Sequence, residues 1–301
     1  MQYNDKGILL IAVGSNQYGR MAANLASSIR AIDANIKIHL VWSGESISHL
    51  TDKHKELFTS MSECPKEYYT KGEKSVYIKP KLFMYELSPF KETLFLDSDV
   101  ILISDNTFKN PSTIFDELKD VELTFQNRDF FDLSKEEINE GYSFWCNVKD
   151  VKEKYFAGGF KNGTGKYYSL HSEFVYFNRS DSNAKFFKLA QQIFDKPLVK
   201  GKEWGGDLPD ELAFAIAMAI TGKYPHKDKY LPLFWFAAEK QIPLSQIRSN
   251  YYGISIGGHI LPERIKGEYE SLAKVYAKMM NLPYHFPVFA KKTWAKERAS
   301  M

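Results

Sequence analysis

The chain has 301 residues, of which 44% are apolar and 26% charged, enough for one large domain or two small ones. Its 40 basic and 37 acidic residues leave a net charge of +3, too small to indicate a nucleic-acid partner by itself. The two cysteines, Cys64 and Cys146, have no metal-like spacing, and no stretch approaches the ~20 apolar residues of a membrane span. We therefore expect a cytoplasmic protein without a transmembrane segment.

The first elements alternate between strand and helix patterns. The apolar run 8–13 predicts a strand buried on both faces, apolar residues at helical spacing predict a helix over 18–33, and 36–42 alternates like a second strand. A strand–helix–strand order predicts a parallel sheet, and such sheets bind ligands at the carboxyl ends of their strands. The loop at Gly14 lies at that end of the first strand.

The rest of the chain is less regular. Residues 45–75 are polar and weakly patterned, and 127–166 is the least regular region. We predict further helices at 81–87, 184–194, 209–220 and 268–280, and strands at 92–103, 121–125, 167–178 and within 250–260. The pattern favours a single α/β domain built on a mixed, mainly parallel sheet flanked by helices.

Two carboxylates, Asp97 and Asp99, interrupt the apolar stretch 92–103, which is otherwise typical of a buried strand. Burying ionised carboxylates is costly unless a cation meets them. Carboxylate oxygens suit Mg²⁺ or Mn²⁺, so this pair predicts a divalent metal site. The alternative is an ordinary Asx turn in which Ser98 and both aspartates are solvated.

The order of these features resembles nucleotide-sugar glycosyltransferases of the A-type fold, in particular the retaining glycogenin and galactosyltransferase-like family. The likeness is strongest from Pro80 to Ile103, where Lys81-Leu82 precedes Leu94-Phe95-Leu96-Asp97-Ser98-Asp99 as a lysine helix precedes the family's Asp-x-Asp strand. It implies one glycosyltransferase domain with a Rossmann-like nucleotide-binding half. The implied divisions are 1–103 for nucleotide binding, 104–265 for the donor sugar and acceptor, and 266–301 for a C-terminal helix and basic tail.

The resemblance implies a metal and phosphate site. Asp97, Asp99 and His259 would hold Mn²⁺ (or Mg²⁺), and Lys81 would face the diphosphate of a UDP-sugar donor. Alternatively, His259 is a polar residue of a Gly-rich turn and Lys81 lies on a solvated helix face. The family's second lysine follows the histidine in a His-x-x-Gly-x-x-Lys-Pro-Trp run. Here 259–266 lacks the glycine, proline and tryptophan, and either Arg264 or Lys266 would replace that contact.

For the nucleoside, the resemblance implies backbone contacts from the loop after the first strand, where Gly14 permits close approach. Tyr18 would stack on the base, or would pack on the core instead. Ser98 would touch the ribose. The loop residues concerned are Ala12, Val13, Gly14 and Ser15.

For the donor sugar, Asp210-Glu211 resembles the family's Asp-Gln pair at a helix start, which binds sugar hydroxyls near the reacting carbon. Asp207 is an alternative, and stabilisation by the helix dipole also explains acidic residues there. Glu173 stands where the family has a glycine, so it either faces the pocket or pairs with a lysine. The family implies retention, whereas Glu173 or Asp207 behind the anomeric carbon would allow inversion.

The acceptor is less defined by sequence. Residues 141–170 interleave aromatics with lysines, and the tail adds four basic residues, a composition that suits glycans or DNA but also occurs on solvated loops. We expect a glycan or other cytoplasmic acceptor. One alternative is a phage-type DNA glycosyltransferase acting on hydroxymethylated pyrimidines. Another is a non-catalytic sugar-nucleotide-binding relative.

Overall fold

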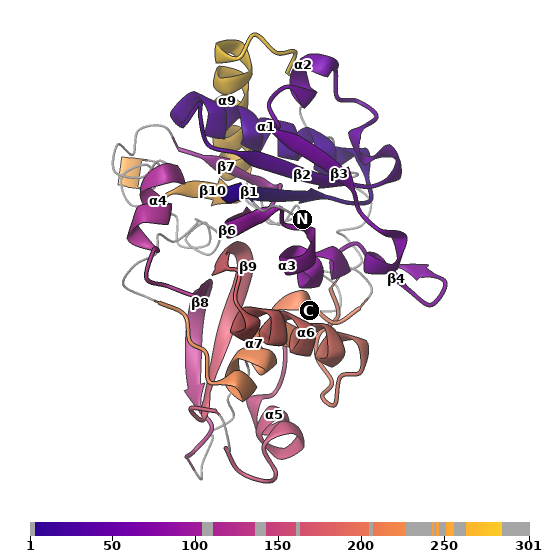
Figure 1. Cartoon of the computed structure of the whole chain (residues 1–301), viewed down its shortest axis with the longest axis vertical. Helices are drawn as coiled ribbons and strands as arrows, with labels where there is room; N and C mark the ends of the chain where they lie inside the picture. The colour runs from indigo at the N-terminus through magenta and orange to yellow at the C-terminus, as the bar shows by residue number, and fades with distance from the viewer. Residues whose placement is uncertain are drawn as a thin grey trace.

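A computed structural model describes residues 4–103, 111–135, 143–160, 163–204, 207–226, 243, 245–246, 251–255 and 263–284. A six-stranded sheet lies at its centre (Figure 1). In spatial order its strands are β3 (Ser60–Glu63), β2 (Ile38–Trp42), β1 (Asn4–Ala12), β6 (Phe90–Leu96), β9 (Lys166–Asn178) and β8 (Leu123–Asp132). The first four run parallel, whereas β9 is antiparallel to both β6 and β8.

Helices cover both faces of this sheet. The helix α1 (Asn16–Ile32) packs on one face, and α6 (Asp181–Asp195) and α7 (Asp210–Thr221) pack on the other. Successive side chains of β1 point to opposite faces, so Leu10 belongs to the core under α1 and Leu9 to the core under α6 and α7. This two-sided burial explains why 8–13 is continuously apolar.

Further helices and two small ribbons surround the sheet. The helix α9 (Glu263–Met279) packs on α1 and on a small antiparallel ribbon of β7 (Val100–Leu102) and β10 (Gly253–Ser255). A second ribbon joins β4 (Thr70–Lys71) to β5 (Lys74–Ser75). The remaining short helices are η1 (Gly44–Ile47), α2 (Asp52–Lys55), η2 (Lys66–Tyr68), η3 (Lys79–Phe83), α3 (Met84–Leu87), α4 (Pro111–Glu117) and α5 (Val148–Tyr155).

The predicted fold class is confirmed, the helix predicted at 81–87 is helical throughout, and the predictions for 92–103 and 127–166 were wrong. The stretch 92–103 forms two strands, β6 and β7, in different sheets, because the chain turns at residues 97–99. The region 127–166 contains the second half of β8 and all of α5. The helix predicted at 81–87 is split between 3₁₀ and α geometry. No helix in the described part of the chain is long and apolar enough to cross a membrane.

Candidate active site

Asp97, Ser98 and Asp99 form a tight turn at the carboxyl end of β6. The amide of Val100 donates to the Asp97 carbonyl at 3.1 Å, and the amide of Ser98 donates to Asp97 Oδ1 at 2.9 Å. Ser98 is only 1% exposed and Asp99 8%. The backbone therefore follows the turn alternative, but Ser98 and Asp99 are buried and the Asp97 side chain keeps 20% exposure, so the turn is not solvated. A ribose contact from Ser98 would require this turn to open.

Lys81 neutralises part of this buried acidic charge. It lies in η3, where Pro80 occupies the first turn, and its Nζ donates to Asp97 Oδ2 at 2.5 Å and to Ser172 Oγ at 3.4 Å. Burial lowers the pKa of the Lys81 ammonium, but attraction by Asp97 and Asp210 outweighs burial and raises it. Lys81 is therefore a charged residue of the site and not part of a solvated helix face.

Glu173 extends the acidic cluster from β9. Its carbonyl accepts the Asp97 amide at 2.9 Å, and its Oε1 accepts Ser255 Oγ at 2.8 Å; the same hydroxyl lies 3.5 Å from Asp99 Oδ1. Burial raises the pKa of Glu173, and the charge of Asp99 raises it further. Its Oε2 is buried without a hydrogen-bond partner among the described residues, so a lysine partner is not seen there.

Asp210 and Glu211 begin α7 on the other side of Lys81, and their environments separate their pKa values. Burial raises the pKa of Asp210 to about 6, although Lys81 opposes that shift. Burial acts in the same direction on Glu211, but hydrogen bonds from His171, Trp145 and the Ser172 amide lower its pKa below the ordinary value. Asp210 Oδ2 is buried and has no hydrogen-bond partner within the described chain. One carboxyl of the pair thus stays ionised while the other titrates near neutrality.

Asp207 lies apart from this cluster. Its Oδ2 pairs with Lys71 Nζ of β4 at 3.0 Å, and its Oδ1 accepts the Leu208 amide at 2.8 Å. The pairing ties the β4–β5 ribbon to the segment before α7. Of the two predicted sugar-binding positions, Asp210 is therefore the one placed beside Lys81.

The loop after β1 reaches the same edge of the sheet. Ala12 and Val13 are buried, and Ser15 caps α1 by accepting the Gln17 amide at 3.2 Å. Gly14 has φ +105°, and its amide donates to Ser43 Oγ at 3.1 Å. A Cβ at Gly14 would lie 2.9 Å from the ring of Tyr77, so close packing and backbone conformation both require glycine.

Tyr18, on the first turn of α1, points toward the acidic turn. Burial raises the pKa of its phenol, and the charges of Asp97 and Asp99 raise it further. This position is one turn from the loop of residues 12–15. The ring packs against the buried apolar clusters on both sides of α1, as the core-packing alternative predicts.

The donor chemistry of the acidic turn fits a hard divalent cation. Asp97 and Asp99 supply carboxylate oxygens from one turn, and the Ser255 hydroxyl lies between Asp99 Oδ1 and Glu173 Oε1. Within the described residues, no three His, Cys, Asp or Glu side chains are already grouped to hold an ion. The predicted third ligand, His259, lies outside the described residues. Lys266 and Arg264 belong to α9, but their side chains are also outside the described part.

Sequence reasoning missed three contributors to this site as functional residues: His171, Ser255 and Trp145. His171 and Trp145 contact Glu211, and Ser255 joins β10 to Glu173. Alternation along β9 could have placed His171 on the same face as Glu173, because side chains two positions apart share a face. No local signal identifies Trp145 or Ser255, since both approach from distant segments.

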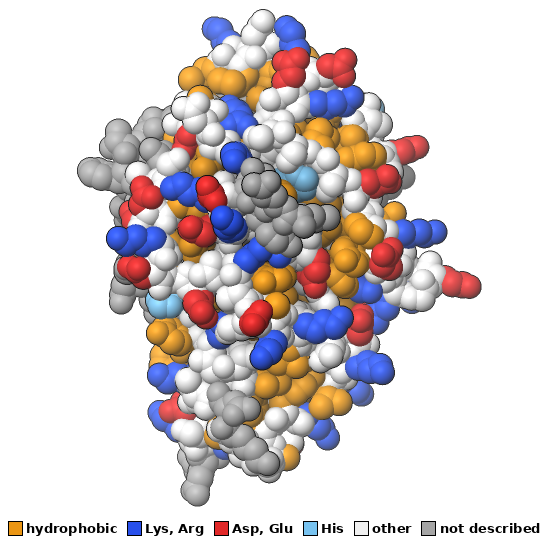
Figure 2. Space-filling model, in the orientation of Figure 1, with side chains coloured by type: hydrophobic (Ala, Val, Ile, Leu, Met, Phe, Trp, Pro, Cys, Tyr) orange, Lys and Arg blue, Asp and Glu red, His pale blue; other side chains and the backbone are white. Residues whose placement is uncertain are grey.

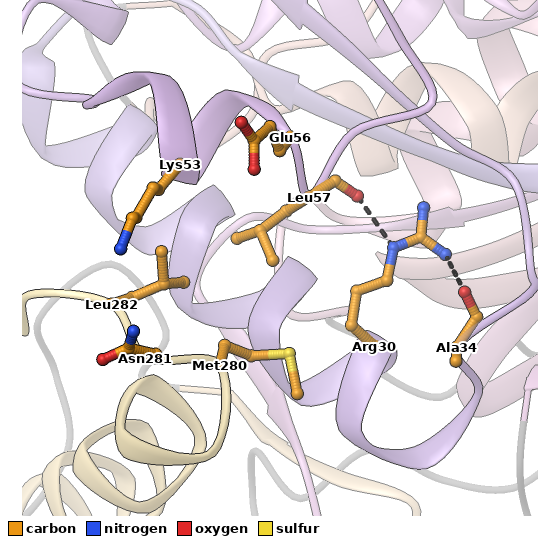
Figure 3. A pocket seen from close by; sticks show the side chains of 8 residues that line it. All are labelled: Arg30, Ala34, Lys53, Glu56, Leu57, Met280, Asn281 and Leu282. Carbon is orange, nitrogen blue, oxygen red and sulfur yellow. Dashed lines mark hydrogen bonds between the residues drawn. The ribbon is translucent and has the colours of Figure 1, made fainter.

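A separate pocket of about 410 Å³ lies at the opposite end of α1 (Figure 3). Arg30 crosses its edge and donates to the carbonyls of Leu57 and Ala34, each at 2.9 Å. Since α1 has 17 residues, about 25 Å of helix separates this pocket from the Gly14 loop. It is lined by Arg30, Ala34, Lys53, Glu56, Leu57, Met280, Asn281 and Leu282.

Two lysines of the 141–170 stretch make their contacts outside the acidic cluster. Lys149 pairs with Glu153 at 3.8 Å on α5, and Lys152 donates to the Lys135 carbonyl at 2.7 Å. On the face drawn in Figure 2, basic and acidic side chains are interspersed. The basic tail predicted at 291–298 lies outside the described residues.

Comparison of the sequence with protein-family models and with curated proteins finds no match. Solved structures with a similar fold include the apo WbbM bifunctional glycosyltransferase, 11% identical with a TM-score of 0.57 over the whole of this chain. The chain spans about half the length of WbbM, covering 52% of that protein. The galactosyltransferase LgtC, solved with donor and acceptor sugar analogues, is 13% identical with a TM-score of 0.51, over 96% of this chain and 99% of LgtC.

The glycosyltransferase GlyE of Streptococcus pneumoniae TIGR4, in its apo form, is 14% identical with a TM-score of 0.50, over 92% of this chain and 63% of GlyE. The chain has the A-type glycosyltransferase fold. At these identities the likeness establishes the fold, and the activity must be argued from the site.

Proposed function

We propose that this protein is a metal-dependent glycosyltransferase that moves a sugar from a UDP-sugar to an acceptor hydroxyl. One observation carries the proposal: a buried Asp97-Ser98-Asp99 turn, paired with Lys81, stands beside the acidic start of α7 in a fold shared with glycosyltransferases. An acidic cluster of this kind is costly to maintain in a folded protein, and a divalent cation, which in turn would bind the donor's diphosphate, would offset that cost.

The donor would lie across the carboxyl ends of β1 and β6. The loop 12–15 would contact the nucleoside through its backbone, and the Tyr18 phenol would donate toward the diphosphate or the acidic turn. Asp97 and Asp99 would hold Mn²⁺ or Mg²⁺, with His259 as the expected third ligand. When bound, the ion supplies Lewis-acid stabilisation of the leaving diphosphate.

Lys81 would move between two partners. Its ammonium pairs with Asp97 and would turn toward the diphosphate when that charge arrives. Because attraction by Asp97, Asp210 and Asp99 raises its pKa, it stays charged throughout the accessible pH range. Lys266 or Arg264 is the expected second phosphate contact.

Asp210 and Glu211 would bind hydroxyls of the transferred sugar. Glu211 is ionised and can only accept hydrogen bonds, whereas Asp210, with a pKa of about 6, exchanges a proton near neutrality. We propose retention, with the leaving phosphate accepting the acceptor proton. Glu173 accepts a hydrogen bond from Ser255, which supports a structural role for Glu173 beside the metal-binding turn.

The acceptor we propose is a saccharide. Trp145 is half-buried next to Glu211, and Phe144 packs edge-on against it with ring centroids 4.5 Å apart. Aromatic rings beside a few polar groups are typical of small-ligand sites.

Calorimetric titration of UDP tests this proposal directly. UDP binding should require Mn²⁺ or Mg²⁺, and Asp99→Asn should weaken it at least about tenfold, the lower range for changes around a metal. Asp116→Asn, a change at a carboxylate with 75% exposure, is the matched control and should bind normally. Metal-independent binding, or equal binding by the Asp99 variant, would refute the metal role.

A further inference from the structure

The Glu211 carboxylate is held by a clamp of three donors from two separate segments, the loop before α5 and strand β9. Trp145 Nε1, from the loop before α5, donates to Oε2 at 2.5 Å. The Ser172 amide of β9 donates to Oε1 at 3.1 Å, and His171 Nδ1 lies 3.5 Å from the same oxygen. The Glu211 side chain keeps 12% exposure. A water-exposed acidic residue at a helix start would need no such donors, so the three contacts distinguish Glu211 from an ordinary residue of that kind.

The clamp fixes which chemical group can meet Glu211. An ionised carboxylate accepts about four hydrogen bonds and donates none, and three of its acceptor positions are taken by the described donors. The remaining position can only receive a donor. Next to it, Asp210 is 4% exposed and has a buried Oδ2 without a hydrogen-bond partner among the described residues. Two acceptor positions at the start of α7 therefore lack a donor among the described residues.

The charges around Glu211 further restrict which sugars can bind there. The negative charges of Asp97 and Glu211 act on Asp210, and Glu211 also acts on Glu173. Lys81 faces these carboxylates from η3, and it is already paired with Asp97. A sugar that carries its own carboxylate would add a like charge to this cluster and would be repelled.

We propose that Trp145 and His171 are positioning residues that fix the Glu211 carboxylate as a hydroxyl acceptor, so that the transferred sugar is neutral and presents a free hydroxyl to it. The inference rests on the proposed glycosyltransferase function and defines its donor class. A sugar lacking that hydroxyl leaves one acceptor position of the Glu211 carboxylate without a donor, and a uronic acid meets like charges.

The test compares binding of UDP alone with binding of the sugar moiety. The probes are UDP, UDP-glucuronic acid and the tighter-bound of UDP-glucose and UDP-galactose, each with Mn²⁺. Trp145→Phe keeps the ring but removes the donor. It should bind UDP normally and lose about 10–100-fold in affinity for the neutral UDP-sugar, as expected for a hydrogen bond to a charged group. Wild type should prefer the neutral sugar to UDP-glucuronic acid at least about tenfold.

Trp204→Phe is the matched control, because Trp204 packs on Trp145 with centroids 6.0 Å apart and is not among the described donors to Glu211. His171→Leu should lose sugar affinity, and His171→Asn, which keeps a donor, should restore it. The acidic limb of the pH profile for kcat/KM should move to higher pH in Trp145→Phe, because the Glu211 pKa rises when a donor is lost.

The outcomes separate two failures. If wild type binds UDP but Trp145→Phe and Trp204→Phe behave alike, or UDP-glucuronic acid binds as well as the neutral donor, this inference is overturned and the proposed function stands. If wild type binds no UDP-sugar with either metal, the proposed function fails and this inference fails with it. Urea unfolding of each variant identifies any that is misfolded. If Trp145→Phe is misfolded, the His171→Leu and His171→Asn pair decides instead, and equal sugar affinity in these two variants overturns the inference.

Discussion

Replacing Asp210 by Asn should stabilise the protein while removing its sugar-binding carboxylate. Burial raises the Asp210 pKa from 3.8 to about 6 despite attraction by Lys81. Between these pH values the native state holds more protons than the unfolded chain, so stability falls as pH rises through that window. The penalty is absent below about pH 4 and fully present above pH 6. It amounts to about 3 kcal/mol, because each pKa unit corresponds to ~1.4 kcal/mol.

Asn is nearly isosteric and carries no charge, so Asp210→Asn should escape this penalty. The variant also loses the favourable interaction of the Asp210 charge with the α7 dipole, which costs ~0.5 kcal/mol. The free energy of unfolding should therefore rise by about 2–3 kcal/mol at pH 7.5. Urea unfolding at pH 7.5 and pH 3.5 measures the difference, which should vanish at the lower pH. Asp116→Asn, on the exposed surface, should change stability by less than about 0.5 kcal/mol at both. If the Asp210 variant were no more stable than wild type at pH 7.5, burial of the ionised Asp210 carboxylate would not destabilise the protein.

Three further predictions concern the same edge of the sheet. Lys81→Met should lower the free energy of unfolding in urea by about 3–5 kcal/mol, because it leaves the largely buried Asp97 without its ion-pair partner. A decrease no larger than that for an exposed ion pair would contradict this. Gly14→Ala should weaken UDP binding and cost about 1–3 kcal/mol, since its Cβ would strike Tyr77, whereas Gly72→Ala (φ +61°, open surroundings) should cost only about 1 kcal/mol. Chelation of divalent metal should abolish donor turnover, and activity that persists in EDTA would exclude metal dependence.

Much of the fold could be predicted because its central strands are buried on both faces. Residues 8–13 are a continuous apolar run and 167–178 is rich in aromatic residues, and the structure places residues 8–12 and 167–178 inside the sheet. The chain reversal at Asp97-Ser98-Asp99 could not be predicted, because the residues on either side are equally apolar. Whether such a stretch continues or turns depends on partners far away in sequence, here β9 on one side and β10 on the other. The helix α5 was missed because it has only eight residues, most of them charged, although Val148, Val151 and Tyr155 stand at helical spacing.

The candidate site was predicted where the chain itself supplies adjacent groups. Asp97 with Asp99, and Asp210 with Glu211, are neighbours in sequence, and the resemblance to glycosyltransferases indicated Lys81. The structure brings Lys81, Asp97 and Asp210 together. The clamp on Glu211 was not visible, because Trp145 is 66 positions away and its approach depends on tertiary packing. Asp207 was a candidate by sequence, but its pairing with Lys71 required the position of the β4–β5 ribbon.

The most direct test of the account is release of UDP from UDP-sugars by the purified protein with Mn²⁺, measured with and without oligosaccharide acceptors. We expect metal-dependent UDP release that an acceptor accelerates, a glycosylated product with the anomeric configuration of the donor, and loss of both in Asp99→Asn. No release from any UDP-sugar, or the same release from Asp99→Asn, would contradict the assignment of the Asp97-Ser98-Asp99 turn as the centre of a glycosyltransferase.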